Sequence, residues 1–235
     1  MLSWKESFNT RSQYATTDRD PFYIIAGNYL PEDKSSVVVD IGCGDGDFAE
    51  LLKLNEEYIN LYLLESNSIT INKLRLVYRN VINYTAPDRI PLPDNSVEYI
   101  HCSHMIEHLN SDDVYKFLIE TDRILKTGGI FIISAPLFWR NFYVDLSHVR
   151  PYYPETFMRY LSFNGSNYSA KNISTRYVKK ELVYRYDAYI PFDDGFGSEY
   201  SVIDFIIKLS KKVLNILKIK YYSRNGFTLV MQKTN

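Results

Sequence analysis

Residues 37–46 constrain the fold of this chain more than any other stretch. Three valines and Asp40 are typical of a buried strand that runs into a turn. Glycine then recurs at every second position, at Gly42, Gly44 and Gly46, and such glycines let the backbone approach a ligand closely. From Asp47 the sequence favours a helix whose N-terminal amides point back at the turn. A strand, glycine loop and helix in this order are a common site for a nucleotide-like cofactor.

The glycine spacing distinguishes between classes of cofactor. Dinucleotide-binding folds space their glycines as G-x-G-x-x-G, whereas this chain has G-x-G-x-G with an acid two residues before the first glycine. The chain also lacks the G-x-x-x-x-G-K-S/T pattern of a phosphate-binding loop. A second apolar run over residues 60–64 ends in Glu65, and an acid at the tip of the second strand accepts hydrogen bonds from ribose hydroxyls. The pattern therefore disfavours an NAD-type dehydrogenase.

Asp40, the three glycines and Glu65 resemble the class I S-adenosylmethionine-dependent methyltransferases, whose first motif reads D/E-x-G-x-G-x-G and whose second strand ends in an acid. Residues 90–100 look like the L-P-F-x-D-x-S-F-D pattern of the small-molecule and glycan-type (type 11-like) members, and residues 125–129 match their L-K/R-P-G-G step. The resemblance implies an α/β fold. That fold is a Rossmann-like, doubly wound, seven-stranded, mostly parallel sheet with helices on both faces and an antiparallel last strand.

The resemblance implies S-adenosyl-L-methionine as the cofactor and assigns a role to each motif position. The residues implied to contact the cofactor form four groups along the chain. They are the glycine loop (Asp40, Gly42, Gly44 and Gly46), the acid that binds the ribose and its neighbour (Glu65 and Ser66), the residues beside the adenine (Asp88 and Ile90) and those beside the methionine (Ser103 and His104). In the family an acid often contacts the adenine four residues before the position of Ile90. That position is Ala86 here, and Asp88 is expected to substitute for it.

Differences in composition along the chain indicate an N-terminal arm and a domain, and the domain contains an insertion and an amphipathic helix. Residues 1–36 are polar and aromatic and are expected to form an N-terminal arm or cap. Residues 37–136 alternate strand and helix, which predicts a mostly parallel sheet, and residues 37–235 are expected to form the methyltransferase domain. Within that domain, residues 137–198 are expected to be a substrate-side insertion and residues 199–218 an amphipathic helix.

Charge and cysteine content limit the partners of the chain. With a net charge of −1 and a pI of about 6.4, no overall basic field attracts nucleic acid, and no such partner is expected. Two cysteines do not make a disulfide framework, which favours a cytoplasmic setting. No apolar run is long enough for a transmembrane segment. The basic amphipathic helix can rest on an anionic membrane, contact a second subunit or cover its own chain, and these alternatives stay open.

Four histidines are candidates for acid–base chemistry, because a hydroxyl acceptor must lose its proton on methylation. His148 is predicted to be the base, with Asp145 orienting its ring and Arg150 holding an anionic group of the acceptor. The alternative is that His148 only pins its own loop to the backbone. Residues 145–157 look like a segment of methyltransferases of glycan and polysaccharide assembly. The resemblance implies O-methylation of a small-molecule or sugar-type acceptor.

Two other functions remain open. Glu107, His108 and the distant His148 resemble the E-x-x-E-H…H ligand set of small-RNA 2′-O-methyltransferases, which implies a metal-assisted RNA reaction. The first Glu of that pattern is His104 here, and the E-H pair also occurs in metal-free relatives, so no metal ligand is predicted. The second alternative is a non-catalytic methyltransferase-like subunit that serves a partner. The intact glycine loop and Glu65 argue against it.

Overall fold

The computed structural model describes residues 11–162, 171–189, 201–216 and 221–235. The chain forms two compact units: residues 19–183 with 226–235, and residues 1–18 with 184–225. All residues predicted to bind the cofactor or the acceptor belong to the first unit.

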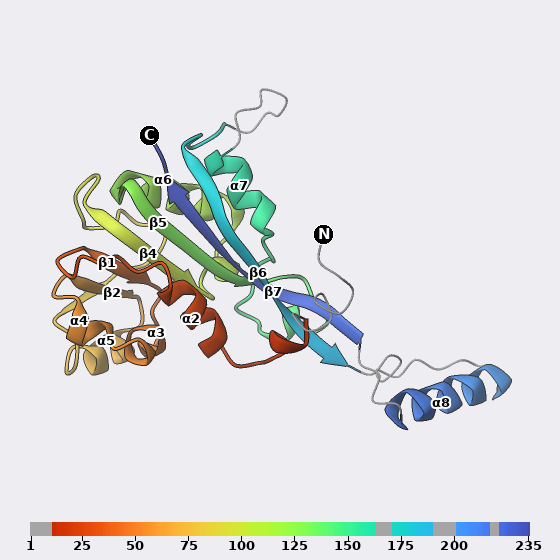
Figure 1. The fold of residues 1–235 in the computed structure, drawn as a ribbon. Helices are drawn as coiled ribbons and strands as arrows, with labels where there is room; N and C mark the ends of the chain where they lie inside the picture. The colour runs from red at the N-terminus through yellow and green to blue at the C-terminus, as the bar shows by residue number, and fades with distance from the viewer. Residues whose placement is uncertain (1–10, 163–170, 190–200, 217–220) are drawn as a thin grey trace. The chain divides into compact units, whose positions relative to one another are not determined.

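The helices and strands follow the alternation expected from the sequence (Figure 1). The strands are β1 (Val38–Ile41), β2 (Leu61–Glu65), β3 (Asn80–Asn83), β4 (Val97–Ser103), β5 (Leu125–Pro136), β6 (Tyr177–Tyr189) and β7 (Tyr221–Lys233). The helices are α2 (Asp20–Gly27), α3 (Asp47–Leu51), α4 (Leu54–Glu57), α5 (Ser68–Leu74), α6 (Ser111–Ile124), α7 (Pro154–Ser162) and α8 (Ser201–Ile216). Two 3-10 turns, η1 (Ile106–His108) and η2 (Phe142–Val144), follow β4 and β5.

The strands form one seven-stranded sheet in the order β3-β2-β1-β4-β5-β7-β6. β1 pairs in parallel with β2 and β4, β2 with β3, and β4 with β5, whereas β7 runs antiparallel to β5. The predicted Rossmann-like sheet with an antiparallel last strand is confirmed. The chain reverses its direction across the sheet between β1 and β4, and ligands of open α/β sheets bind at such a reversal.

Buried residues hold in place the strands and helices around the point where the strand order reverses, between β1 and β4. All four residues of β1 are buried, as a central strand with both faces covered requires. Figure 1 shows α3, α4 and α5 on one side of the sheet and α6 and α7 on the other. The buried Tyr99 hydroxyl in β4 donates to the carbonyl of Ala26 at 2.8 Å, which fastens α2 to the sheet.

Two helix boundaries differ from those that the sequence predicts, which are an N-cap at Ser68 and a helix end at the glycines 128–129. The N-cap of α5 is Asn67, not Ser68, because the Asn67 side chain accepts hydrogen bonds from the amides of Ile69 (2.9 Å) and Thr70 (3.2 Å). Helix α6 ends at Ile124 rather than at the glycines 128–129, because pairing with β4 already begins at Leu125.

Helix α8 lies in the second unit, inside the predicted range 199–218, whose end residues fall outside the described residues. Several apolar side chains on it are exposed, namely Val202, Ile203, Phe205, Ile206, Leu209, Val213 and Ile216. Among the described residues, no helix has both the length and the apolar character needed to cross a membrane. Contact of this helix with a membrane or a second subunit stays a prediction.

The corrected cap of α5 gives a test of the fold. Asn67→Ala removes the side chain that caps two helix amides and should lower the free energy of unfolding by about 1 kcal/mol. Ser68→Ala, one residue further on, should change it by less than about 0.5 kcal/mol. Equilibrium denaturation of both variants measures the difference. A larger loss in Ser68→Ala than in Asn67→Ala would contradict the assignment.

Candidate active site

A cavity of about 500 Å³ opens where the carboxyl ends of β1, β2 and β4 meet. Its walls come from the glycine loop after β1, the tip of β2, residues 84–86 after β3 and residues 103–109 after β4. Arg19 and Tyr23, at the start of α2, also line it. The sequence placed the cofactor at this edge of the sheet, and the structure brings a cavity to the same place.

The glycines of the loop have backbone conformations that other residues rarely adopt. Their φ angles are +69° at Gly42, +54° at Gly44 and +90° at Gly46. A Cβ atom at Gly42 would lie 2.9 Å from side-chain carbons of Met105, whereas a Cβ at Gly44 would meet nothing within 4 Å. Gly42 is therefore required for packing, while Gly44 keeps its backbone open toward the cavity.

Glu65 joins the tip of β2 to the glycine loop. Its Oε2 accepts a hydrogen bond from the Gly44 amide at 3.0 Å. Its Oε1 accepts from the amides of Ser66 and Asn67, each at 2.9 Å. These bonds fix the carboxylate at the cavity wall, where Ser66 also lies.

Asp40 forms a buried pair with His101 beneath the loop. The Asp40 Oδ1 and His101 Nδ1 atoms are 2.8 Å apart, and both side chains are almost fully buried. The ring of Phe48 stacks on His101 with centroids 3.8 Å apart. The second carboxylate oxygen of Asp40 is buried and has no hydrogen-bond partner among the described residues. Because Asp40 also lines the cavity, this oxygen is a candidate contact for a polar group of a bound molecule.

The cysteine in the loop does not take part as a nucleophile. Burial raises the pKa of the Cys43 thiol far above its usual value, and the carboxylates of Asp40 and Glu65 raise it further. The thiol therefore stays protonated at neutral pH, and a protonated thiol is neither a nucleophile nor a metal ligand.

The structure does not bring Asp88 and Ile90 to the cavity wall, where Tyr84, Thr85 and Ala86 lie instead. Ile90 is fully buried, and its amide donates to Glu120 at 3.0 Å. The Arg123 guanidinium donates to the carbonyls of Ile90 (2.8 Å) and Leu92 (2.9 Å), which fastens this loop to α6. The adenine contacts implied for Asp88 and Ile90 stay predictions.

Ser103 and His104 also line the cavity, and their implied contacts to the methionine stay predictions. His104 has a left-handed backbone with a φ of +54°, a conformation that costs about 1–2 kcal/mol in a residue with a Cβ. Its amide donates to the carbonyl of Ser134 at 2.9 Å, and its Nδ1 lies 3.2 Å from Oε1 of the buried Glu107. The backbone strain is therefore held by hydrogen bonds from the sheet and from η1.

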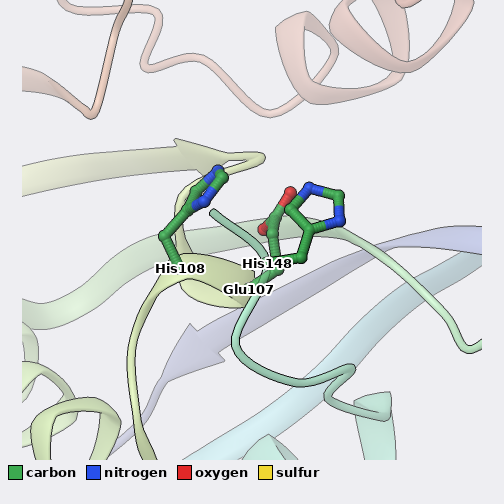
Figure 2. Close-up of side chains that lie close together, drawn as sticks. All are labelled: Glu107, His108 and His148. Carbon is green, nitrogen blue, oxygen red and sulfur yellow. The ribbon is translucent and has the colours of Figure 1, made fainter. Parts of the chain in front are cut away.

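His148, in the loop after η2, does not line the cavity, but its ring centre lies 5.1 Å from that of His108, which does. Its Nδ1 lies 2.7 Å from the carbonyl of Phe142, and its Nε2 lies 3.8 Å from Asp145. The Asp145 carboxylate instead accepts from the amide (2.9 Å) and hydroxyl (2.6 Å) of Ser147. The Phe142 carbonyl is thus the group within hydrogen-bond distance that orients the His148 ring, and this bond also pins the loop. Figure 2 shows His148 beside Glu107 and His108.

A second cavity of about 570 Å³ is lined by residues of α6, η2, α7 and the loop between the last two. Arg150 lines it, together with five tyrosines: Tyr115, Tyr143, Tyr152, Tyr153 and Tyr160. The Arg150 guanidinium lies 5.2 Å from the centre of the Tyr152 ring and donates to the Ser111 hydroxyl at 2.7 Å. The tyrosine abundance seen in the sequence thus includes a local concentration around one cation.

Several residues that line the two cavities are not predicted from the sequence. Arg19 and Tyr23 lie in the segment read as an arm, and the Asp20-Pro21 helix start was the available signal that this segment is ordered. The concentration of tyrosines had no signal in the sequence, because its members come from α6, η2, α7 and the loop between the last two.

Comparison with known proteins agrees with the fold and with the glycine loop. Residues 39–133 match the family model described as "Methyltransferase domain". The chain is 34% identical over 104 residues to "Probable methyltransferase PMT9" of Arabidopsis thaliana, covering 42% of this chain and 16% of that protein. It is 33% identical over 100 residues to a "Probable S-adenosylmethionine-dependent methyltransferase" of Mycolicibacterium smegmatis, covering 42% of this chain and 37% of that protein. The chain thus spans well under half of either relative.

A solved structure extends the likeness over nearly the whole chain. An S-adenosylmethionine-dependent methyltransferase from Archaeoglobus fulgidus superimposes with a TM-score of 0.57 at 21% identity. The superposition covers 97% of this chain and 99% of that one. At this identity the likeness shows the fold alone. The family match over residues 39–133, the sheet order and the glycine loop together support a class I S-adenosylmethionine-dependent methyltransferase.

Proposed function

We propose that this chain transfers the methyl group of S-adenosylmethionine to an oxygen atom of a small or sugar-type acceptor. The observation that carries the proposal is the position of Glu65, whose carboxylate lies at the cavity wall and is bonded to the Gly44 amide at 3.0 Å. A carboxylate at the tip of the second strand, facing a glycine loop, is suited to accept hydrogen bonds from two ribose hydroxyls.

The residues around the cavity fit the cofactor. Gly44 offers open backbone, and Asp40 offers a buried oxygen without a partner among the described residues, suited to the amino group of the methionine end. Arg19 supplies a cation suited to its carboxylate. When bound, S-adenosylmethionine supplies a methyl group on a positively charged sulfur, so the leaving group is already good. The work left to the protein is mainly to hold the two reactants in line.

The second cavity is suited to the acceptor. Tyrosine rings offer flat apolar faces with a polar tip, which pack on sugar rings and donate hydrogen bonds to their hydroxyls. Arg150 at its edge is suited to a phosphate or carboxylate on the acceptor. The hydroxyl of Tyr152 donates to the carbonyl of Leu109, a residue that lines the cofactor cavity, at 2.9 Å. This hydrogen bond links a residue that lines the second cavity to a residue that lines the cofactor cavity.

His148 has the atom that a general base needs. If its Nδ1 donates to the Phe142 carbonyl, its Nε2 carries a lone pair. Asp145 lies too far from the ring for a hydrogen bond and is left to support the loop through Ser147. The role of His148 as the base that removes the acceptor proton stays a prediction.

Cofactor binding tests the proposal directly. Wild-type protein should bind S-adenosylmethionine and S-adenosylhomocysteine with micromolar affinity in calorimetry and should not bind NAD. Glu65→Ala should weaken binding by about 10-fold or more, because a hydrogen bond to a charged group is worth roughly 1.5–3 kcal/mol. Glu56→Ala, which removes an exposed carboxylate from α4, should have no effect. Failure of the wild type to bind either compound would refute the proposal.

A matched pair of glycine variants separates strain from ligand contact. Gly44 (φ +54°) and Gly128 (φ +86°) both have room for a Cβ atom, but Gly44 alone of the two lines the cavity. Each change to Ala should lower the free energy of unfolding by about 1–2 kcal/mol. Cofactor affinity should fall in Gly44→Ala and stay unchanged in Gly128→Ala. Equal affinities in the two variants would show that Gly44 does not face the cofactor.

The acceptor side is tested by kinetics with sugar nucleotides and glycans as the first compounds screened. Arg150→Ala should raise KM for an anionic acceptor by about 10-fold or more, since a charge-assisted hydrogen bond is lost. Affinity for S-adenosylmethionine should not change. Lys116→Ala, which removes an exposed cation from α6, is the control. An unchanged KM in Arg150→Ala would place the acceptor elsewhere.

A further inference from the structure

We infer that Glu107, His108 and His148 bind one divalent metal ion at the edge of the cofactor cavity. One ligand atom of each residue lies within 4.8 Å of those of the other two. Figure 2 shows the three side chains extending to the same side of the backbone, from turn η1 and from the loop that carries His148. The binding of the ion rests on these residues alone, whereas its role toward the acceptor rests on the proposed function.

The carboxylate of Glu107 is the strongest indication of a ligand. The residue is 1% exposed, and its Oε1 lies 3.2 Å from His104 Nδ1. Its Oε2 is buried and has no hydrogen-bond partner within the part of the chain that the structure describes. A buried charged oxygen without a partner costs free energy, and proteins rarely retain one without an ion or a water molecule beside it.

Both histidines are oriented as metal ligands usually are. His108 Nδ1 lies 3.1 Å from the carbonyl of Ser147, and His148 Nδ1 lies 2.7 Å from the carbonyl of Phe142. A carbonyl oxygen can only accept, so each Nδ1 carries a proton, and in the neutral form of each ring Nε2 is the nitrogen with the lone pair. A histidine that binds a metal through one nitrogen commonly donates its other N–H to a backbone carbonyl in this way.

The cluster is already assembled by the backbone. The amide of Val149 donates to the carbonyl of Glu107 at 2.8 Å, which holds the loop after η2 against η1. For a tetrahedral ion with bonds of about 2.1 Å, the ligand atoms must be about 3.4 Å apart. Ligand atoms that are 4.8 Å apart must therefore move about 1.4 Å closer, by side-chain rotation, to complete the site. His108 is exposed, so an ion can reach the cluster from solvent. Glu107 is buried and provides a carboxylate ligand at the inner side of the cluster.

The ligand set indicates the class of ion and its use. One carboxylate oxygen and two imidazole nitrogens favour Mn²⁺, Fe²⁺, Co²⁺ or Zn²⁺ over Mg²⁺ or Ca²⁺. Three protein ligands leave coordination positions open, and His108 also lines the cofactor cavity. An ion there would bind the acceptor oxygen and make its hydroxyl more acidic. In the metal-bound chain the lone pair of His148 Nε2 is used to bind the ion, so the predicted role of His148 as the base applies to the metal-free chain alone.

Metal titration of the 235-residue chain tests this inference without the cofactor or the acceptor. After treatment with a chelator and its removal, the chain is titrated with Mn²⁺ in electron paramagnetic resonance and with Co²⁺ in visible absorption. We expect one ion per chain. Glu107→Gln and His108→Gln should each lower the affinity by about 10-fold or more. Glu155→Gln, which removes an exposed carboxylate on α7, should leave the affinity unchanged.

Two results would overturn the inference: no binding of either ion to the wild type, or unchanged affinity in the folded variants. Circular dichroism checks folding, and His108→Gln decides the matter if Glu107→Gln does not fold, because His108 is exposed. Binding of S-adenosylmethionine to the metal-free chain is measured in parallel. Cofactor binding without metal binding would refute the metal site and leave the proposed function standing. Metal binding without cofactor binding would support the metal site and refute the proposed function.

Discussion

The site depends on a single hydrogen bond, from the Gly44 amide to the carboxylate of Glu65. That bond ties the loop after β1 to the tip of β2 and requires the left-handed backbone at Gly44, which residues with a Cβ atom rarely adopt. Because the same carboxylate accepts from two amides at the start of the next turn, its position is fixed before any ligand arrives. A preformed acceptor loses little conformational freedom on binding, which favours affinity.

A second set of bonds joins the cofactor cavity to the tyrosine-lined one. The carbonyl of Glu107 accepts from the amide of Val149, and Tyr152 donates to the carbonyl of Leu109. These contacts hold the segment after β5 against the turn after β4, although the two are about forty residues apart in sequence. The arrangement brings the histidines and Arg150 to one end of the sheet, where methyl transfer needs the acceptor to be held in line with the cofactor.

The sequence was most informative where function depends on local structure. The sequence predicts that the glycine loop and Glu65 lie together, and the structure joins them through the hydrogen bond from Gly44 to Glu65. The sheet follows from the alternation of strands and helices. The cap of α5 was misplaced by one residue because Asn67 and Ser68 are both good capping residues, and the choice depends on how the chain leaves β2.

The parts of the site that the sequence does not predict are those formed by contacts between segments far apart in the chain. Arg123 fastens the loop of Ile90 to α6, and Tyr84 to Ala86 rather than Asp88 face the cavity. No local pattern encodes that outcome. The proximity of His148 to Glu107 was suggested only by a resemblance, since spacing alone does not show that two loops meet. The tyrosines likewise form a common wall only after the sheet has placed α6 and α7 near each other.

The most direct test of the account is a crystal structure of the chain with S-adenosylhomocysteine. We expect density for the compound in the cavity at the ends of β1, β2 and β4, with both ribose hydroxyls bonded to Glu65 and the sulfur toward His104. Density at another place, or ribose hydroxyls that contact no atom of Glu65, would contradict the central claim that this carboxylate and the glycine loop form the cofactor site.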